Sequence, residues 1–272
     1  MGDSTERTVP AVQPGARSPG LTRRQALGAL SLLGLASCSG GGDSGDGSTT
    51  TTTATGSGTG STGTTGSTGS TGSTTASCVL IPEETVGPYP LFSSIAAAAV
   101  YQRQDITEGK TGVPLRLTLR VVNVNDGCKA ITNAMMYVWH CDKDGVYSGY
   151  SQPGANAIGE TFCRGVQATD ENGEATFLTI YPGWYTGRIT HIHFRVYLGN
   201  SLGATSQLAF PQDITAAVYA SSLYAARGQN TSVRSFSADN VFSDGTQYQM
   251  CTVAANATTG GYDAALVVGI VA

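Results

Sequence analysis

The chain contains three histidines, and two of them form the motif His191-Ile192-His193. Alternate side chains of an extended strand point to one face, so these imidazoles lie about 7 Å apart along the backbone on the same side. Two such imidazoles can converge on one metal ion, and His-x-His is a common ligand spacing. A pair of structural, hydrogen-bonded histidines has the same spacing, so the dyad alone leaves both interpretations open. We expect the third histidine, His140, which follows Trp139, to be structural or supporting.

Tyrosines accompany the dyad. Tyr185 lies in the stretch TIYPGWYTGR shortly before His191, and Tyr147 ends the stretch WHCDKDGVY. A phenolate oxygen is a hard anionic donor, and a trivalent cation can hold a side chain with an ordinary pKa near 10 deprotonated at neutral pH. Zinc hydrolases usually complete their sites with a third histidine or a carboxylate, so tyrosines change the expected metal. The competing interpretation of each tyrosine is a packing residue with a hydrogen-bonded hydroxyl.

The two tyrosine stretches, with Arg188 before the dyad, resemble the intradiol ring-cleavage dioxygenases, the family of catechol 1,2-dioxygenase and protocatechuate 3,4-dioxygenase. The resemblance extends over about residues 78–272. The segment PEETVGPYP at 82–90 is similar to the segment at which the family's domain begins, and Ser206-Gln207-Leu208 follows the dyad at a family-like spacing. The resemblance implies four protein ligands for one mononuclear, non-haem Fe(III) ion, namely Tyr147, Tyr185, His191 and His193.

The same resemblance implies an oxidoreductase that opens catechol-type rings between the two hydroxyl-bearing carbons. Both atoms of O2 would enter a cis,cis-muconate-type product. It further implies that the substrate displaces Tyr185, which then serves as a base, while Tyr147 remains bound.

Three further roles come from the resemblance. Arg188 corresponds to an arginine over the ring, where its fixed charge stabilises developing carbanion character, and a structural ion pair is the competing role. Gln207 is expected near the bound ring, and Pro88 and Tyr89 are expected to wall the substrate cleft. Val86 stands where relatives often have an acidic residue, so the choice of catechol stays open.

Alternation of apolar and polar residues indicates the elements that must position these side chains. Strands are expected at 115–121, 135–142, 175–181, 190–198 and 264–271, separated by turn sequences such as Asp144-Gly145 and Asn172-Gly173. One short helix is expected at 213–223, an Ala-rich segment after a proline. We therefore predict an all-β fold, an antiparallel β-sandwich with long loops.

The N-terminal part has a different composition. Residues 39–77 are almost entirely Gly, Ser and Thr, which cannot bury enough apolar surface to offset the entropy of ordering, so we predict a disordered linker. Before it, Arg23-Arg24 precedes a short apolar run at 26–36, which is typical of a twin-arginine export signal. The sequence Leu35-Ala36-Ser37-Cys38 resembles a bacterial lipobox.

We therefore expect a signal at 1–38, a linker at 39–77 and one catalytic domain at 78–272. Cys38 would carry a lipid, and cleavage by an ordinary peptidase is the alternative. Both place the domain outside the cytoplasm, either at the outer face of a bacterial membrane or secreted.

Charge and cysteine content limit the partners. A net charge of −4 with 12% charged residues argues against nucleic acid, and against any membrane contact except through the lipid on Cys38. The cysteines after it can form at most two bridges, and a bridge between Cys141 and Cys163 would brace the site. Their pairing stays open, as does the oligomeric state, for which a monomer is tenable because no helical dimerisation segment is added.

Two other classes of protein compete with the dioxygenase interpretation. One is a non-catalytic β-sandwich module that displays a binding surface on a tether, but such a module has no need for two tyrosines, an arginine and a His-x-His motif. The other is a metal-dependent hydrolase that uses the histidine pair. It would require zinc and a carboxylate ligand and would be colourless, whereas ferric tyrosinate absorbs visible light.

Overall fold

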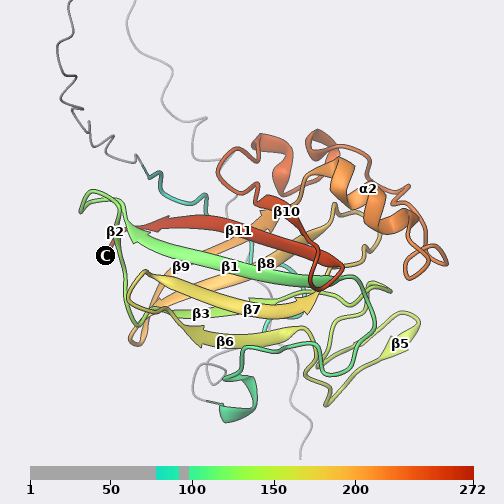
Figure 1. Ribbon diagram of the computed structural model, residues 1–272, viewed down its shortest axis with the longest axis horizontal. Coiled ribbons are helices and arrows are strands. Elements are labelled where there is room, and N and C mark those ends of the chain that lie inside the picture. Colours follow the sequence, from blue (N-terminus) through green and yellow to red (C-terminus); the bar gives the residue numbers. More distant parts are fainter. Residues whose placement is uncertain (1–77, 92–97) are drawn as a thin grey trace, which may run out of the picture. The chain divides into compact units, whose positions relative to one another are not determined.

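A computed structural model describes residues 78–91 and 98–272 of the chain (Figure 1). The predicted export signal, Cys38 and the linker at 39–77 lie outside the described residues. Within the described part of the chain, no helix has both the length and the apolar character needed to cross a membrane.

Two β-sheets form a sandwich, as the alternation predicts (Figure 1). The first sheet contains β1 (Pro114–Asn123), β2 (Lys129–Ala130), β7 (Glu174–Ile180), β10 (Thr252–Asn256) and β11 (Gly261–Ile270). It has the order β10-β11-β1-β2, and β7 also pairs with β1. The second sheet has the order β6-β3-β8-β9, with the strands β3 (Met135–Trp139), β6 (Arg164–Ala168), β8 (His191–Leu198) and β9 (Ser201–Ala209). Among these named strands, only β1 and β11 pair in parallel.

Smaller elements stand outside the two sheets. The described residues contain one α-helix, three 3-10 helices and one two-stranded hairpin, which are α2 (Gln212–Ala220), η1 (Ala99–Tyr101), η2 (Phe236–Ala238), η3 (Phe242–Asp244), and β4 (Ser151–Gln152) with β5 (Ala155–Asn156). The fold class expected from the sequence is therefore confirmed, including the single helix after Pro211.

The core lies between the sheets and is built from every second residue of the strands. Leu115, Leu117 and Leu119 of β1 are buried and belong to the same apolar cluster as Ile192 and Phe194 of β8. Burial of such side chains contributes about 1.5–3 kcal/mol each. Because the period of a strand is two, the residues between them face outward, and on the second sheet this outer face carries both histidines of the dyad.

A segment that we call the N-terminal strap (residues 80–91) runs over this outer face. It begins against the first sheet, where the backbone N–H of Ile81 donates to the carbonyl of Gly269, 2.8 Å. It then reaches β9, where the N–H of Glu84 donates to the carbonyl of Thr205, 2.9 Å. The strap therefore joins the edges of both sheets before it reaches the dyad.

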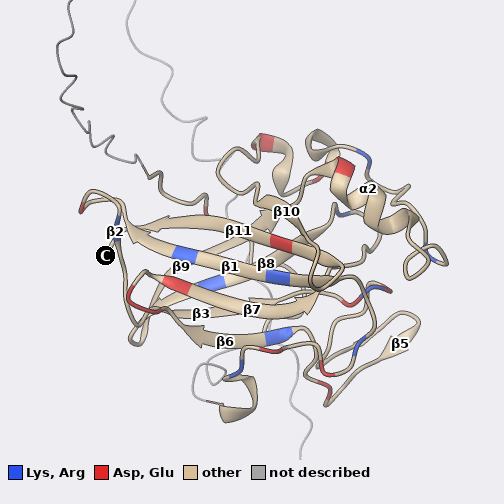
Figure 2. Cartoon of the chain, viewed as in Figure 1, with Lys and Arg blue, Asp and Glu red and all other residues tan. Residues whose placement is uncertain are grey.

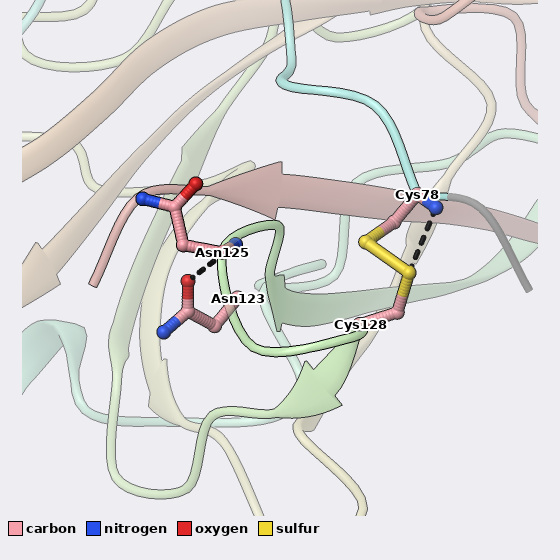
Figure 3. The surroundings of a disulfide bond; sticks show 4 residues. All are labelled: Cys78, Asn123, Asn125 and Cys128. Carbon is pink, nitrogen blue, oxygen red and sulfur yellow. Dashed lines mark hydrogen bonds between the residues drawn. A yellow bond between two sulfur atoms is a disulfide. The ribbon is translucent and has the colours of Figure 1, made fainter. Parts of the chain in front are cut away.

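A disulfide fastens the chain just before the strap. Cys78 is bonded to Cys128, which lies in the turn between β1 and β2 (Figure 3). The same turn is closed by the side-chain oxygen of Asn123, which accepts a hydrogen bond from the backbone N–H of Asn125, 3.0 Å. Cys141 and Cys163 are both free and buried, so the bridge between them that the sequence left open is not formed.

Charged residues are dispersed over the molecule. Figure 2 shows acidic and basic residues scattered singly and in small groups of both signs over strands and loops of the described part. This distribution agrees with the low charge density of the sequence.

Candidate metal and substrate site

The structure brings the four candidate ligands together. The Nε2 atoms of His191 and His193 lie 3.1 Å apart. The hydroxyl of Tyr185 lies 3.1 Å from Nε2 of His191, and the hydroxyl of Tyr147 lies 3.1 Å from Nε2 of His193. Tyr147 and His193 are fully buried, His191 is nearly so, and Tyr185 is partly exposed. Two oxygens and two nitrogens therefore gather in a chain of close contacts on the outer face of β8.

Two loops that pack against each other carry the two tyrosines. Tyr147 follows a turn in which the side-chain oxygen of Asp142 accepts hydrogen bonds from the backbone N–H groups of Asp144 and Val146, 3.0 Å each. The loop that carries Tyr185 packs directly onto this turn, because a β-carbon on Gly183 would lie 2.3 Å from the carbonyl oxygen of Lys143. Glycine is needed for this close approach of two backbones.

The electrostatics of the cluster suit a bound cation. Burial raises the pKa of Tyr147 well above its usual value and that of Tyr185 to about 12. Burial also lowers the pKa of His191 to about 3 and that of His193 well below its usual value. The protein alone therefore keeps both phenols and both imidazoles neutral, and a bound cation is what would favour the ionised form of the phenols.

The tautomer of His191 supports the same conclusion. Its Nδ1 lies 2.5 Å from the carbonyl oxygen of Ile189. A carbonyl oxygen only accepts hydrogen bonds, so Nδ1 carries the proton and Nε2 presents its lone pair to the cluster. With the phenol oxygens of Tyr147 and Tyr185, this arrangement fits a hard trivalent cation such as Fe(III).

The described residues offer no alternative metal cluster. Nowhere in residues 78–91 and 98–272 do three or more His, Cys, Asp and Glu side chains gather so that they could hold an ion. Within these ranges no carboxylate therefore joins the histidine pair in a cluster of that kind.

Arg188 forms the ion pair that the sequence analysis gave as its competing role, and its role over a bound ring stays a prediction. Its Nε donates to both carboxylate oxygens of Asp239, 3.2 and 2.9 Å, and its Nη2 donates to the side-chain oxygen of Gln207, 2.8 Å. Its Nη1 lies 3.5 Å from Nε2 of His191. The guanidinium is thus held by an ion pair on one side and faces the ligand cluster on the other.

Asp239 is a site residue that the sequence analysis missed. Its carboxylate is fully buried and also accepts hydrogen bonds from the backbone N–H groups of Ile189, 2.7 Å, and Val241, 2.8 Å. Burial alone would raise the pKa of Asp239, but the Ile189 N–H and the Arg188 cation together lower it below its usual value. The sequence indicates only that a buried arginine needs an acidic partner, and no motif identifies which acid is that partner.

Gln207 connects Arg188 to the strap. It is fully buried, lies opposite His193 in the β8–β9 register, and donates from Nε2 to the carbonyl of Thr85, 2.9 Å. The prediction that Gln207 lies near the bound ring stays a prediction, but its contact with Arg188 makes it part of the same network.

Aromatic rings pack around the cluster. The indole of Trp139 stacks on the imidazole of His193 with centroids 4.9 Å apart, and its N–H points to the carbonyl of Pro88, 3.4 Å. The ring of Tyr89 lies 5.1 Å from that of Tyr147. His140 is not part of the cluster; it is buried between the carbonyl of Cys141 and the hydroxyl of Thr179, as expected of a structural histidine.

A cavity of about 600 Å³ opens beside the cluster. Tyr185 lines it, as do Pro88 and Tyr89, the two residues expected to wall the substrate cleft. Its other walls come from the turn before Tyr147, from the β4–β5 hairpin and from Arg227. Tyr185 therefore stands between the buried ligand cluster and a space that can receive a substrate.

Comparison with known proteins identifies the class. Residues 88–253 match the family model described as "Dioxygenase", so the chain belongs to this dioxygenase family. No curated protein sequence matches the chain. This membership favours an enzyme over the tethered binding module.

Solved structures specify the kind of dioxygenase that the chain resembles. An intradiol ring-cleavage dioxygenase from Tetranychus urticae is 28% identical, with a TM-score of 0.63 over 71% of this chain and 95% of that chain. The dioxygenase domain of a carbohydrate-binding fusion protein from Streptomyces sp. SirexAA-E, 24% identical, covers 71% of this chain and 100% of its own, with a TM-score of 0.51, and shows the shared fold. The resemblance to intradiol ring-cleavage dioxygenases found in the sequence is confirmed.

Proposed function

We propose that the chain is a non-haem Fe(III) dioxygenase that opens catechol-type rings between the two hydroxyl-bearing carbons with O2, giving cis,cis-muconate-type products. The observation that carries the proposal is the convergence of two tyrosine hydroxyls and two histidine Nε2 atoms, with neighbouring contacts of 3.1 Å, beside a cavity of about 600 Å³. Membership of the dioxygenase family and the likeness to the Tetranychus urticae enzyme support it.

Tyr147, Tyr185, His191 and His193 would hold the iron. Bound Fe(III) would keep the phenols deprotonated and make a bound catechol reactive toward O2. Tyr147 is enclosed by protein on all sides, so it is suited to remain a ligand throughout the reaction. Tyr185 is the one partly exposed member and lines the cavity, so its phenolate oxygen is suited to accept a hydroxyl proton from an incoming catechol.

Arg188 supplies a permanent positive charge at the same place. Asp239 and Gln207 hold its guanidinium, so the charge is already oriented before substrate arrives. A preorganised charge in a water-poor site stabilises negative charge that develops on the ring without any change in protonation. The rings of Trp139 and Tyr89 pack against His193 and Tyr147 and support these two candidate ligands.

The test is the visible spectrum of the full-length chain after iron loading, with metal analysis, before and after anaerobic addition of catechol. We expect one iron per chain, a broad visible band that shifts with catechol, and incorporation of both atoms of labelled O2 into the product.

Tyr185→Phe should shift the band and lower turnover. Tyr181→Phe is a matched control, because Tyr181 is a buried tyrosine of the same stretch whose hydroxyl contacts Thr215 outside the cluster.

A chain that stays colourless after iron loading would eliminate the four-ligand site. A coloured protein that opens the ring beside the two hydroxyls, rather than between them, would retain the site but reject the intradiol reaction.

A further inference from the structure

The cavity beside Tyr185 is larger than a simple dihydroxybenzene ring requires. Its volume of about 600 Å³ lies in the range of pockets that enclose drug-sized ligands. A catechol whose oxygens replace Tyr185 at the cluster would occupy only the inner end of this space. We call the part of the cavity that is lined by Gln152, Gly154 and Arg227 its outer part.

Arg227 gives this outer part a fixed cation. Its Nε donates to the carbonyl of Trp184, 2.8 Å, and its guanidinium carbon lies 4.5 Å from the centroid of the Trp184 ring. A β-carbon on Gly145 would lie 2.9 Å from its Nη2, so the guanidinium reaches the turn that precedes Tyr147. The contact with the Trp184 ring and the hydrogen bond from Nε orient the guanidinium and leave its terminal nitrogens for a ligand.

No carboxylate competes for this fork. Among the described residues, none of the ion pairs includes Arg227. Asp144 is the one acid in the cavity wall, and it pairs with the ammonium of Lys143 at 2.8 Å. The part of the wall that Arg227 forms therefore favours an anionic group.

We propose that the outer cavity is a subsite for a carboxylate borne on a spacer from the catechol ring, and that Arg227 is the residue that selects it. The substrate class is then arylalkanoic or arylalkenoic acids with a catechol ring. Their carboxylate pairs with the guanidinium fork while the ring oxygens reach the cluster. This inference rests on the proposed function and specifies its substrate.

The experiment compares 3-(3,4-dihydroxyphenyl)propanoate with its isosteric, neutral amide, using the iron-loaded full chain. Turnover is measured as kcat/KM, and anaerobic affinity is measured by calorimetry, which does not depend on turnover. We expect the acid to be preferred about fivefold in both measurements, as a bidentate pair at an exposed arginine allows. Added salt should weaken the binding of the acid and leave the binding of the amide unchanged, because screening acts on the charged ligand.

Variants separate recognition from a structural effect. Arg227→Gln should bring the acid-to-amide ratio close to one, and Arg227→Lys should restore part of it. If the substitution only disturbed the structure, kcat/KM and affinity would fall together for both ligands, and the acid-to-amide ratio would stay unchanged. Arg120→Gln is the matched control, since Arg120 also donates from Nε to a backbone carbonyl, that of Asn172, but lines no part of this cavity.

The outcomes distinguish this inference from the proposed function. Equal turnover and equal affinity for acid and amide in the wild type, or a ratio that survives Arg227→Gln, would overturn the subsite and leave the dioxygenase proposal in place. Failure to open any catechol, unsubstituted catechol included, would reject the proposed function and this inference with it.

Discussion

Gly87 lies directly against the imidazole of His193. A β-carbon on Gly87 would lie 2.4 Å from Cε1 of that ring, which is closer than real atoms approach, and 3.0 Å from Nδ1. The backbone of Gly87 also has φ +72, a conformation that other residues adopt at a cost. The N-terminal strap therefore helps to set the position of a candidate metal ligand.

The first prediction concerns this contact. Gly87→Ala should displace His193 and lower the affinity for iron about tenfold or more, measured by competition with a chelator. Gly109→Ala is the matched control, because Gly109 has φ +74 but nothing within 4 Å of its added β-carbon. The control should lose about 1 kcal/mol of stability from backbone strain and no iron affinity. Equal iron affinity in the two variants would contradict the role of the strap.

The second prediction concerns the ion pair of Arg188 and Asp239, whose side chains are 8% and 0% exposed. Asp239→Asn leaves the guanidinium without its charged partner, and breaking a buried pair in this way costs about 3–5 kcal/mol. We expect a loss of that order in urea unfolding and a larger fall in kcat than in substrate affinity. Glu108→Gln provides the comparison, since its pair with Arg103 is more exposed and should cost about 1 kcal/mol or less. Similar losses in both variants would show that the buried pair has no special role.

The third prediction is a pH dependence from His140. Burial lowers the pKa of His140 from its usual value to about 4, so the folded state holds this imidazole neutral while the unfolded chain protonates it below about pH 6.5. The unfolded state then binds more protons, and stability falls as the pH decreases between these two values. His140 alone should account for a loss of about 3 kcal/mol.

Urea unfolding of the metal-free chain over this pH range, with His140→Gln beside the wild type, isolates the contribution. The wild type should be the more stable at neutral pH, and the difference should shrink toward about pH 4. Parallel curves for the two proteins would show that His140 does not titrate in this way.

The fourth prediction concerns the disulfide between Cys78 and Cys128, which are 50 residues apart. Replacing both cysteines by serine removes a cross-link from the unfolded chain and should cost about 2–4 kcal/mol. Because the bond lies at the start of the strap, iron should also be released faster from the variant. Reductant should destabilise the wild type and leave the double variant unchanged, and a wild type indifferent to reductant would refute the prediction.

Strand periodicity let the sequence determine several features of this protein. His191 and His193 share a face because side chains alternate along a strand, and the residues between and after them enter the core for the same reason. The resemblance to the intradiol family indicates which two tyrosines accompany the histidines, and phenolate oxygens in such a set favour a hard cation because the preference of a donor for a metal is a property of its own atoms. These are local properties, and local geometry is what a sequence pattern encodes.

Only the tertiary structure decided which distant residues meet. β9 has no clear alternation, and it is a strand because β8 provides its hydrogen-bonding partners. Asp239 reaches Arg188 across 51 residues, and Gly87 reaches His193 through the strap. Such contacts depend on how loops of particular length pack on the finished sandwich, so no spacing along the chain predicts them.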